Sequence, residues 1–158
     1  MQAQNLEAMK RLLIFLLLLL PFVAEAQSRL YKGNSTYSSD ILYTYDGKHL
    51  YAGSSTYSGD ILFTFDGEYV YRGNSTYTGD IILTFDGRYI YDGRSTYSGD
   101  TLFTCDGKYL YVGCSTYTTH TLCTITRKHI YRGRSSYSGD ILYTMSGYIP
   151  LPLLVLVM

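Results

Sequence analysis

The chain of 158 residues has no tryptophan, few prolines, only three cysteines and no excess of either charge. Thirteen lysines and arginines balance thirteen aspartates and glutamates, so no basic field is available to hold nucleic acid. Paired cysteines at zinc-site spacing are also missing. We therefore expect no nucleic-acid partner, no metal and no other cofactor.

The residues that are abundant, 19 tyrosines and 15 glycines, follow a fixed pattern. Six copies of a twenty-residue unit, approximately YxGxSTYSGDILFTFDGKYL, follow one another without insertions. The copies begin at Tyr31, Tyr51, Tyr71, Tyr91, Tyr111 and Tyr131. Such a period indicates an array in which each unit buries its apolar surface against its neighbours. Residues 27–147 are thus expected to form one repeat domain.

Residues 1–26 have the pattern of a secretory signal peptide, and translation starts at Met1 or Met9. Lys10 and Arg11 precede an apolar run, and small residues end the segment at Ala26, where cleavage is expected. The run is too short for a membrane anchor, so we expect no transmembrane span. The mature chain is expected to be secreted, periplasmic or at the cell surface.

Within a unit, two strand-forming runs flank an Asp-Gly pair, as in Ile61–Phe65, Asp66-Gly67 and Tyr69 onward. Asp-Gly between such runs predicts a hairpin with a two-residue type I′ turn, which would place Phe65 opposite Glu68. We expect one strand of about ten residues and one of about six per unit, joined by two tight turns.

Both faces of this hairpin carry large side chains. One face is expected to hold Ile61, Phe63, Phe65 and Val70, and the other Leu62, Thr64, Tyr69 and Tyr71. A flat sheet would leave one of these faces in water, so the fold class is all-β with the hairpins curled into a solenoid, a curved sheet or a closed barrel. The alternative is a parallel β-helix. It would stack the repeated aspartates into two ladders that repel one another unless calcium neutralises them.

The fifth unit departs most from the pattern, and the three cysteines lie around it. With Thr118-Thr119 as its turn, Cys114 would lie opposite Cys123 in a pair close enough for a disulfide. We therefore expect a Cys114–Cys123 disulfide that leaves Cys105 unpaired. Three free thiols are the alternative.

No catalytic constellation is evident, and we expect no enzyme. The repeated Ser-Thr-Tyr triplets have no recurring histidine and acid beside them. His49, His120 and His129 fall in two different columns of the repeat, which favours surface positions over metal ligands. Asp before Gly is explained by turn geometry, with calcium binding as the alternative.

One tyrosine column offers a candidate ligand site. It consists of Tyr37, Tyr57, Tyr77, Tyr97, Tyr117 and Tyr137. Buried, these rings would form the wall of a curved sheet. Exposed, they would suit sugar rings, which stack on aromatic groups and hydrogen-bond to polar neighbours.

The twenty-residue aromatic and glycine unit resembles bacterial secreted repeat proteins, in particular choline-binding and glucan-binding cell-wall repeats, in period and hairpin plan. That resemblance implies a cell-wall or extracellular glycan as partner. Those repeats rely on tryptophan, so their pockets are not carried over to this chain. The unit also resembles curli-type functional amyloid, which implies self-association.

Together these observations predict an exported, non-enzymatic repeat protein that provides a structural or interaction surface. A carbohydrate-binding module that uses the tyrosine column and a fibre-forming subunit are the alternatives. Residues 148–158 form an apolar tail that breaks the period. We expect this tail to cover the open edge of the last hairpin, and a truncated or shifted reading frame is the alternative.

Overall fold

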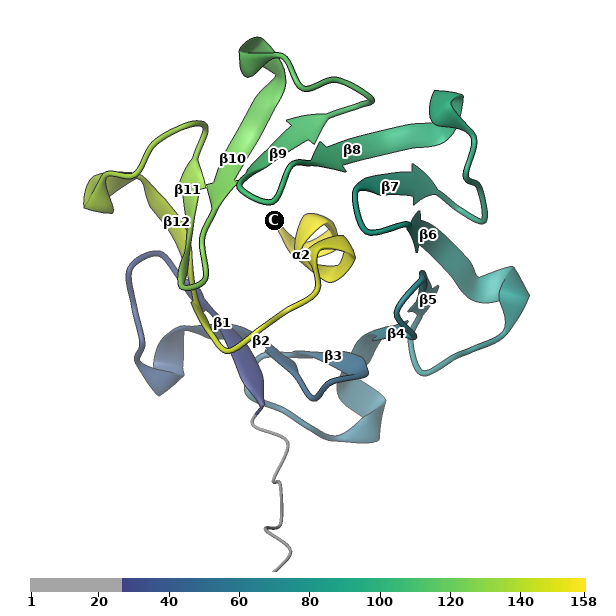
Figure 1. The fold of residues 1–158 in the computed structure, drawn as a ribbon. Helices are drawn as coiled ribbons and strands as arrows, with labels where there is room; N and C mark the ends of the chain where they lie inside the picture. Colours follow the sequence, from purple (N-terminus) through teal and green to yellow (C-terminus); the bar gives the residue numbers. More distant parts are fainter. Residues whose placement is uncertain (1–26) are drawn as a thin grey trace, which may run out of the picture.

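The computed structural model describes residues 27–158, in which twelve antiparallel strands form one closed barrel (Figure 1). The all-β prediction is confirmed, and closure selects the barrel over the solenoid and the open curved sheet. The antiparallel pairing excludes the parallel β-helix. The expected signal peptide lies outside the described residues.

Each hairpin consists of a first strand and a second strand. The first strands are β2 (Ile41–Tyr45), β4 (Ile61–Phe65), β6 (Ile81–Phe85), β8 (Thr101–Cys105), β10 (Thr121–Ile125) and β12 (Ile141–Ser146). The second strands are β3 (His49–Ala52), β5 (Tyr69–Arg72), β7 (Tyr89–Asp92), β9 (Tyr109–Val112), β11 (His129–Arg132) and β1 (Ser28–Lys32).

The turn inside each hairpin is shifted from the predicted one. Phe65 pairs with Val70 instead of Glu68, so the two central residues of the turn are Gly67 and Glu68. Gly67 has φ +107°, while no non-glycine residue of the described part has a positive φ, which rules out the predicted type I′ turn centred on Asp66. Asp66 instead flanks the turn and accepts hydrogen bonds through Oδ1 from the backbone N–H groups of Glu68 and Tyr69.

This shift moves the pairing by two residues and therefore leaves Phe63, Phe65 and Val70 on their predicted face, because side chains alternate with a period of two. Ile61 differs from the prediction, since an irregularity in the register between β3 and β4 pairs it with Tyr51. Phe63, Phe65 and Val70 belong to the apolar core, as expected. Thr64 pairs with Tyr71 on the opposite face.

The connection between hairpins is a loop instead of the predicted tight turn, and the strands are four to six residues long. Gly73 follows β5 with φ +60°, a conformation that ends the strand. Each loop then contains a short 3-10 turn: Ser38–Asp40, Ser58–Asp60, Thr78–Asp80, Ser98–Asp100, Thr118–His120 and Ser138–Asp140. These loops form the outer rim of the ring (Figure 1).

The sixth hairpin joins the two ends of the repeat domain. β12 pairs with β1, with Thr144 opposite Tyr31, just as Thr64 lies opposite Tyr71 within one repeat. Thr144 Oγ1 donates to the Gly33 carbonyl oxygen at 2.7 Å, as Thr64 Oγ1 does to that of Gly73. The ring is therefore closed without a covalent link at this position.

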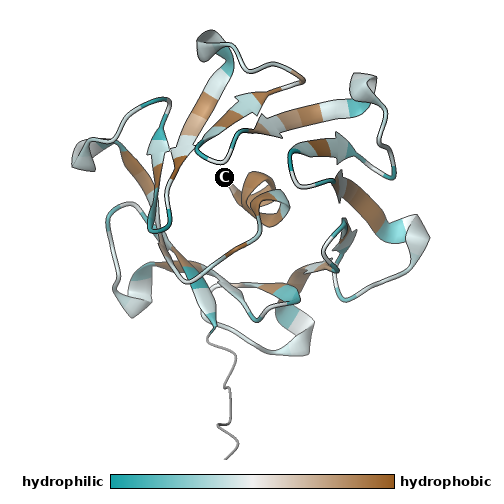
Figure 2. Ribbon diagram, viewed as in Figure 1, coloured by the Kyte–Doolittle hydropathy of each residue, from teal (hydrophilic) through white to brown (hydrophobic). Residues whose placement is uncertain are grey.

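The core lies inside the ring. One residue from each second strand is completely buried there: Leu30, Leu50, Val70, Ile90, Leu110 and Ile130. The helix α2 (Leu151–Val157) occupies the centre of the ring, and its apolar surface faces the apolar inner parts of the strands (Figure 2). Leu153 and Leu154 of α2 belong to the same core cluster.

The position of the tail corrects the expectation that it covers an open edge. β1 already occupies the edge of β12, so the apolar residues of the tail are buried in the centre instead. Among residues 27–158, no helix has the length and apolar character needed to cross a bilayer.

Candidate functional site

The tyrosine column predicted as a ligand site lies on the rim loops and is open to solvent. Its six side chains, Tyr37, Tyr57, Tyr77, Tyr97, Tyr117 and Tyr137, are 72–81% exposed. The possibility that these rings form a buried wall is therefore wrong. The column that begins each repeat is buried instead, and its members Tyr31, Tyr51, Tyr71, Tyr91 and Tyr111 are at most 7% exposed.

Hydrogen bonds within each rim loop fix its conformation. In the second repeat, Ser55 Oγ accepts from the Tyr57 N–H at 3.1 Å and donates to Asp60 Oδ2 at 2.5 Å. The Asp60 N–H donates to the Tyr57 carbonyl oxygen at 2.9 Å. The same three bonds recur in five of the loops, because Ser, Tyr and Asp keep their columns there. Each of these loops thus holds a carboxylate near its exposed tyrosine.

In three consecutive loops the tyrosine ring also rests on a glycine. A Cβ at Gly59 would lie 2.8 Å from Tyr57 Cε1, and the equivalent distances at Gly79 and Gly99 are 2.7 and 2.6 Å. The glycines are needed for this close approach of the ring and not for a positive φ. The rings of Tyr57, Tyr77 and Tyr97 therefore lie in the same way over their loops.

The fifth rim loop differs chemically from the other five. His120 replaces the aspartate, and its Nδ1 lies 2.8 Å from Ser115 Oγ. Its ring makes an edge contact with Tyr117. His49 and His129 lie instead on the hairpins, so the three histidines do not meet. Across residues 27–158, no group of three or more His, Cys, Asp or Glu residues is placed to hold a metal ion.

The buried tyrosine column stabilises the hairpin turns. Tyr51 donates its hydroxyl to Asp46 Oδ2 at 2.7 Å, and Asp46 Oδ1 accepts from the N–H groups of Lys48 and His49. Burial alone would raise the pKa of Asp46, but these hydrogen bonds lower it to about 2. Burial and the Asp46 carboxylate raise the pKa of Tyr51 to about 12. Turn geometry therefore accounts for these aspartates, as the sequence predicts.

The hydrogen-bonded Asp–Tyr pairs should make the folded chain most stable at intermediate pH, with stability lost in acid and in strong alkali. Because the pKa of Asp46 is lower in the folded chain, its stabilisation is present above about pH 4 and is lost as pH falls toward 2. The loss at this one residue is about 2 kcal/mol. The raised pKa of Tyr51 gives a stabilisation present below pH 10 and lost as pH rises through about 12.

Thermal unfolding across this pH range measures the loss of stability at acid pH and at alkaline pH. Tyr51→Phe is the matched variant. It should reduce the alkaline loss and leave the ring folded at neutral pH. An unfolding temperature that stays constant from pH 5 to pH 2 would contradict this role of the aspartates.

The predicted Cys114–Cys123 pair does not form, and Cys105, Cys114 and Cys123 are free thiols. Gly113, with φ +70°, ends β9 before Cys114, which is exposed in the rim loop. Cys123 instead lies opposite Leu110 and is 1% exposed in the core. Burial raises its pKa to about 12.

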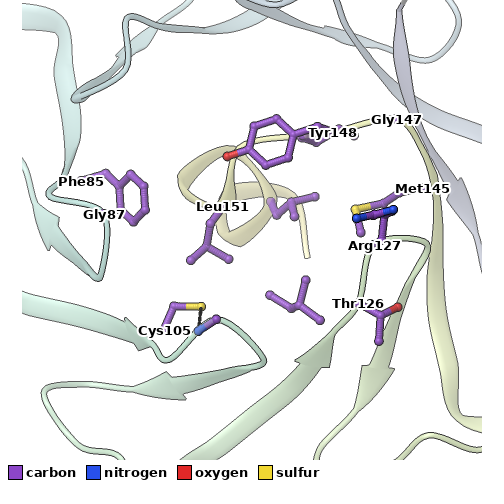
Figure 3. A pocket seen from close by; sticks show the side chains of 13 residues that line it. Phe85, Gly87, Cys105, Thr126, Arg127, Met145, Gly147, Tyr148 and Leu151 are labelled. Carbon is purple, nitrogen blue, oxygen red and sulfur yellow. Dashed lines mark hydrogen bonds between the residues drawn. The ribbon is translucent and has the colours of Figure 1, made fainter.

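A cavity of about 750 Å³ lies between α2 and the hairpin ends of the third to sixth repeats (Figure 3). Phe85 and Met145 lie on opposite sides of it, and Leu151 projects toward it from α2. Thr126 and Arg127 of the fifth repeat also line it. Sequence reasoning missed this cavity. The signals that could have indicated it are the altered fifth turn and the apolar tail, which both break the sixfold repetition.

The chain was compared with known protein families and proteins. Residues 50–150 match the family model described as 6-fold beta flower protein. No curated protein matched the chain. No solved structure matched it either. The matched segment covers more than half of the chain, and the sixfold ring of hairpins agrees with the description of the family. The chain therefore belongs to the 6-fold beta flower protein family.

Proposed function

We propose that this repeat protein is an exported, multivalent binding protein whose rim tyrosines contact an extracellular glycan. The observation that carries the proposal is the exposure of all six rings of one column, at 72–81%. A large aromatic side chain is normally at least half buried, so its exposure at the same position in every repeat indicates a contact surface.

The chemistry of the rim loops suits a sugar. The Tyr57 ring rests on Gly59 and keeps its remaining surface open for stacking. Within the described chain, Asp60 Oδ1 has no hydrogen-bond donor, so it is available to accept from a sugar hydroxyl. Stacking combined with a carboxylate acceptor matches a ring that has apolar faces and a hydroxylated edge.

The closed ring of six hairpins also makes the protein multivalent. Six loops of the same length surround one closed barrel, so a repeating polymer can contact several of them at once. Weak binding at each loop then adds up, because every later contact is intramolecular. This geometry favours a polysaccharide over a single small sugar.

The proposed location outside the cytoplasm is supported by the sequence of residues 1–26. The alternative of a fibre-forming subunit is not favoured. Every strand from β1 to β12 has a hydrogen-bonded neighbour on both sides, which leaves no strand edge of the described barrel open for another chain.

The test is binding of the mature chain to an array of extracellular glycans, followed by calorimetric titration with N-acetylglucosamine oligomers and with the strongest array ligand. The triple variant Tyr57→Ala, Tyr77→Ala, Tyr97→Ala is expected to weaken binding about tenfold or more, since half of the rim contacts are removed. Binding to no glycan by the folded chain would overturn the proposal.

Two controls separate ring contacts from general effects. The matched triple variant with Phe at the same positions keeps the rings and should retain most of the affinity. Val112→Ala changes a side chain that is 52% exposed but outside the rim loops, and it should not alter binding. Equal affinity of the Ala and Phe triple variants would show that the rings do not carry the contact.

A further inference from the structure

The cavity beside α2 has the size and lining of a small-molecule site. Its volume of about 750 Å³ falls within the range of about 300–1,000 Å³ that is typical of such sites. Phe85, Ile125, Met145, Leu151 and Leu154 give it an apolar wall. Figure 3 shows that this wall combines strand residues with the central helix, so the cavity is built from parts distant in the sequence.

A single charged side chain, Arg127, lines this cavity. No carboxylate of the described chain forms an ion pair with Arg127. The aspartates of the neighbouring turns, Asp86 and Asp106, are already engaged, since each accepts from a tyrosine hydroxyl and from backbone N–H groups. The guanidinium is therefore available to an external anion.

The fifth turn differs from its neighbours at the two positions that set this charge. Where the third and fourth repeats have Asp-Gly, the fifth has Thr126-Arg127. Asp to Thr removes one negative charge and Gly to Arg adds one positive charge, so the formal charge of the turn changes from −1 to +1. Thr126 Oγ1 accepts from the His129 N–H at 2.9 Å and so keeps the turn closed without a carboxylate.

We propose that this cavity binds one small amphipathic ligand, with an apolar body held against the wall and an anionic head group paired with Arg127. A carboxylate is the simplest such head group, because its two oxygens match the guanidinium fork. The site is separate from the rim tyrosines and does not depend on the glycan proposal.

Decanoate is the probe, with decan-1-ol and decylamine as the neutral and cationic compounds of the same chain length. We expect calorimetry to show decanoate binding with one ligand per chain, and binding to be weaker for the alcohol and weakest for the amine. Equal affinity for the three compounds would overturn the proposal, as would the absence of decanoate binding.

Arg127→Gln tests the head-group contact. It should weaken decanoate binding by about 10- to 100-fold, the loss expected for one charge-assisted pair, and leave decan-1-ol binding unchanged. Arg88→Gln is the matched control, since Arg88 lies in the third turn but does not line the cavity. Unchanged decanoate affinity in Arg127→Gln would overturn the assignment.

The cysteines provide a second readout of where the ligand lies. Cys105 lines the cavity, and Cys114 is exposed in a rim loop. Burial raises the pKa of the Cys105 thiol, so alkylation is best followed at mildly alkaline pH. Decanoate should slow iodoacetamide labelling of Cys105 and leave that of Cys114 unchanged. Decanoate binding in this cavity would be contradicted if labelling slowed at neither cysteine or slowed equally at both. The triple Ala variant of the rim tyrosines should retain this protection, which separates the two proposals.

Discussion

Replacing Leu30 with Asp is expected to open the ring and abolish its cooperative thermal unfolding. Leu30 lies on β1, is completely buried and belongs to the core cluster. β1 also forms the only junction between the two ends of the described barrel, because it pairs with β12 on one side and β2 on the other. Loss of this strand therefore exposes two strand edges at once.

The size of the effect follows from two losses. Truncation of a buried leucine costs about 2–5 kcal/mol, and an unpaired buried carboxylate adds several more. Typical domains have a total stability of about 5–15 kcal/mol, so the folded ring should not persist. Leu30→Ala isolates the first loss and should lower the free energy of unfolding by about 2–5 kcal/mol.

Circular dichroism during heating and size-exclusion chromatography measure this prediction. Val112→Asp is the control, because Val112 lies on β9 but is half exposed, and it should leave the transition nearly unchanged. A cooperative transition of Leu30→Asp at the temperature of the unmodified chain would contradict the role of β1.

Replacing Leu153 with Asp is expected to displace α2 from the centre of the ring and to destabilise the fold. Leu153 lies on α2, is completely buried and belongs to the core cluster inside the ring. A carboxylate there should displace α2 from the centre and lower the stability by about 3–5 kcal/mol. The closing contacts of β1 are untouched, so the β-sheet signal in circular dichroism should remain at low temperature.

Displacement of α2 would expose the inner wall of the ring, and binding of the dye ANS measures that exposure. We expect increased ANS fluorescence for Leu153→Asp together with a lower unfolding temperature. Met158→Asp is the control at the exposed end of the chain and should bind little dye. Equal ANS binding by the two variants would show that α2 does not fill the ring.

The strands and their faces could be predicted from the sequence because both depend on short-range patterns. The alternation of Phe63, Thr64 and Phe65 sets which side chains share a face, and a register shift of two residues does not change it. The position of the turn could not be fixed in the same way. Both Asp66 and Gly67 favour turns, and the hydrogen bonds of the Asp66 side chain decide which residues are central.

Closure of the ring depends on a contact between distant residues. The sixth repeat ends at Gly147, and the residues missing from it are supplied by Arg29-Leu30-Tyr31, which match His49-Leu50-Tyr51. In a repeat that starts at Tyr31, the last hairpin has no second strand of its own, which is why the sequence predicts an open edge there. The position of the tail was then mispredicted for the same reason.

The rim loops show a similar limit. A glycine with positive φ ends each second strand, as Gly73 ends β5. The strand-forming residues on either side of it made a longer strand the expected structure. The loop that results places Cys114 away from Cys123 and exposes the tyrosine column. The candidate ligand residues were thus identified from the sequence, but their exposure depended on the length of the loop.

Cross-linking of β1 to β12 tests ring closure most directly. Arg29 and Ser146 are Cα partners across this junction, and partners in antiparallel strands approach within the range of a disulfide. Arg29→Cys with Ser146→Cys is predicted to form an intramolecular disulfide in the monomer and to raise the unfolding temperature. The control variant, Arg29→Cys with Val112→Cys on β9, should form no intramolecular disulfide between the two introduced cysteines. Disulfides found only between two chains, or at equal yield in both variants, would contradict a ring closed by β1.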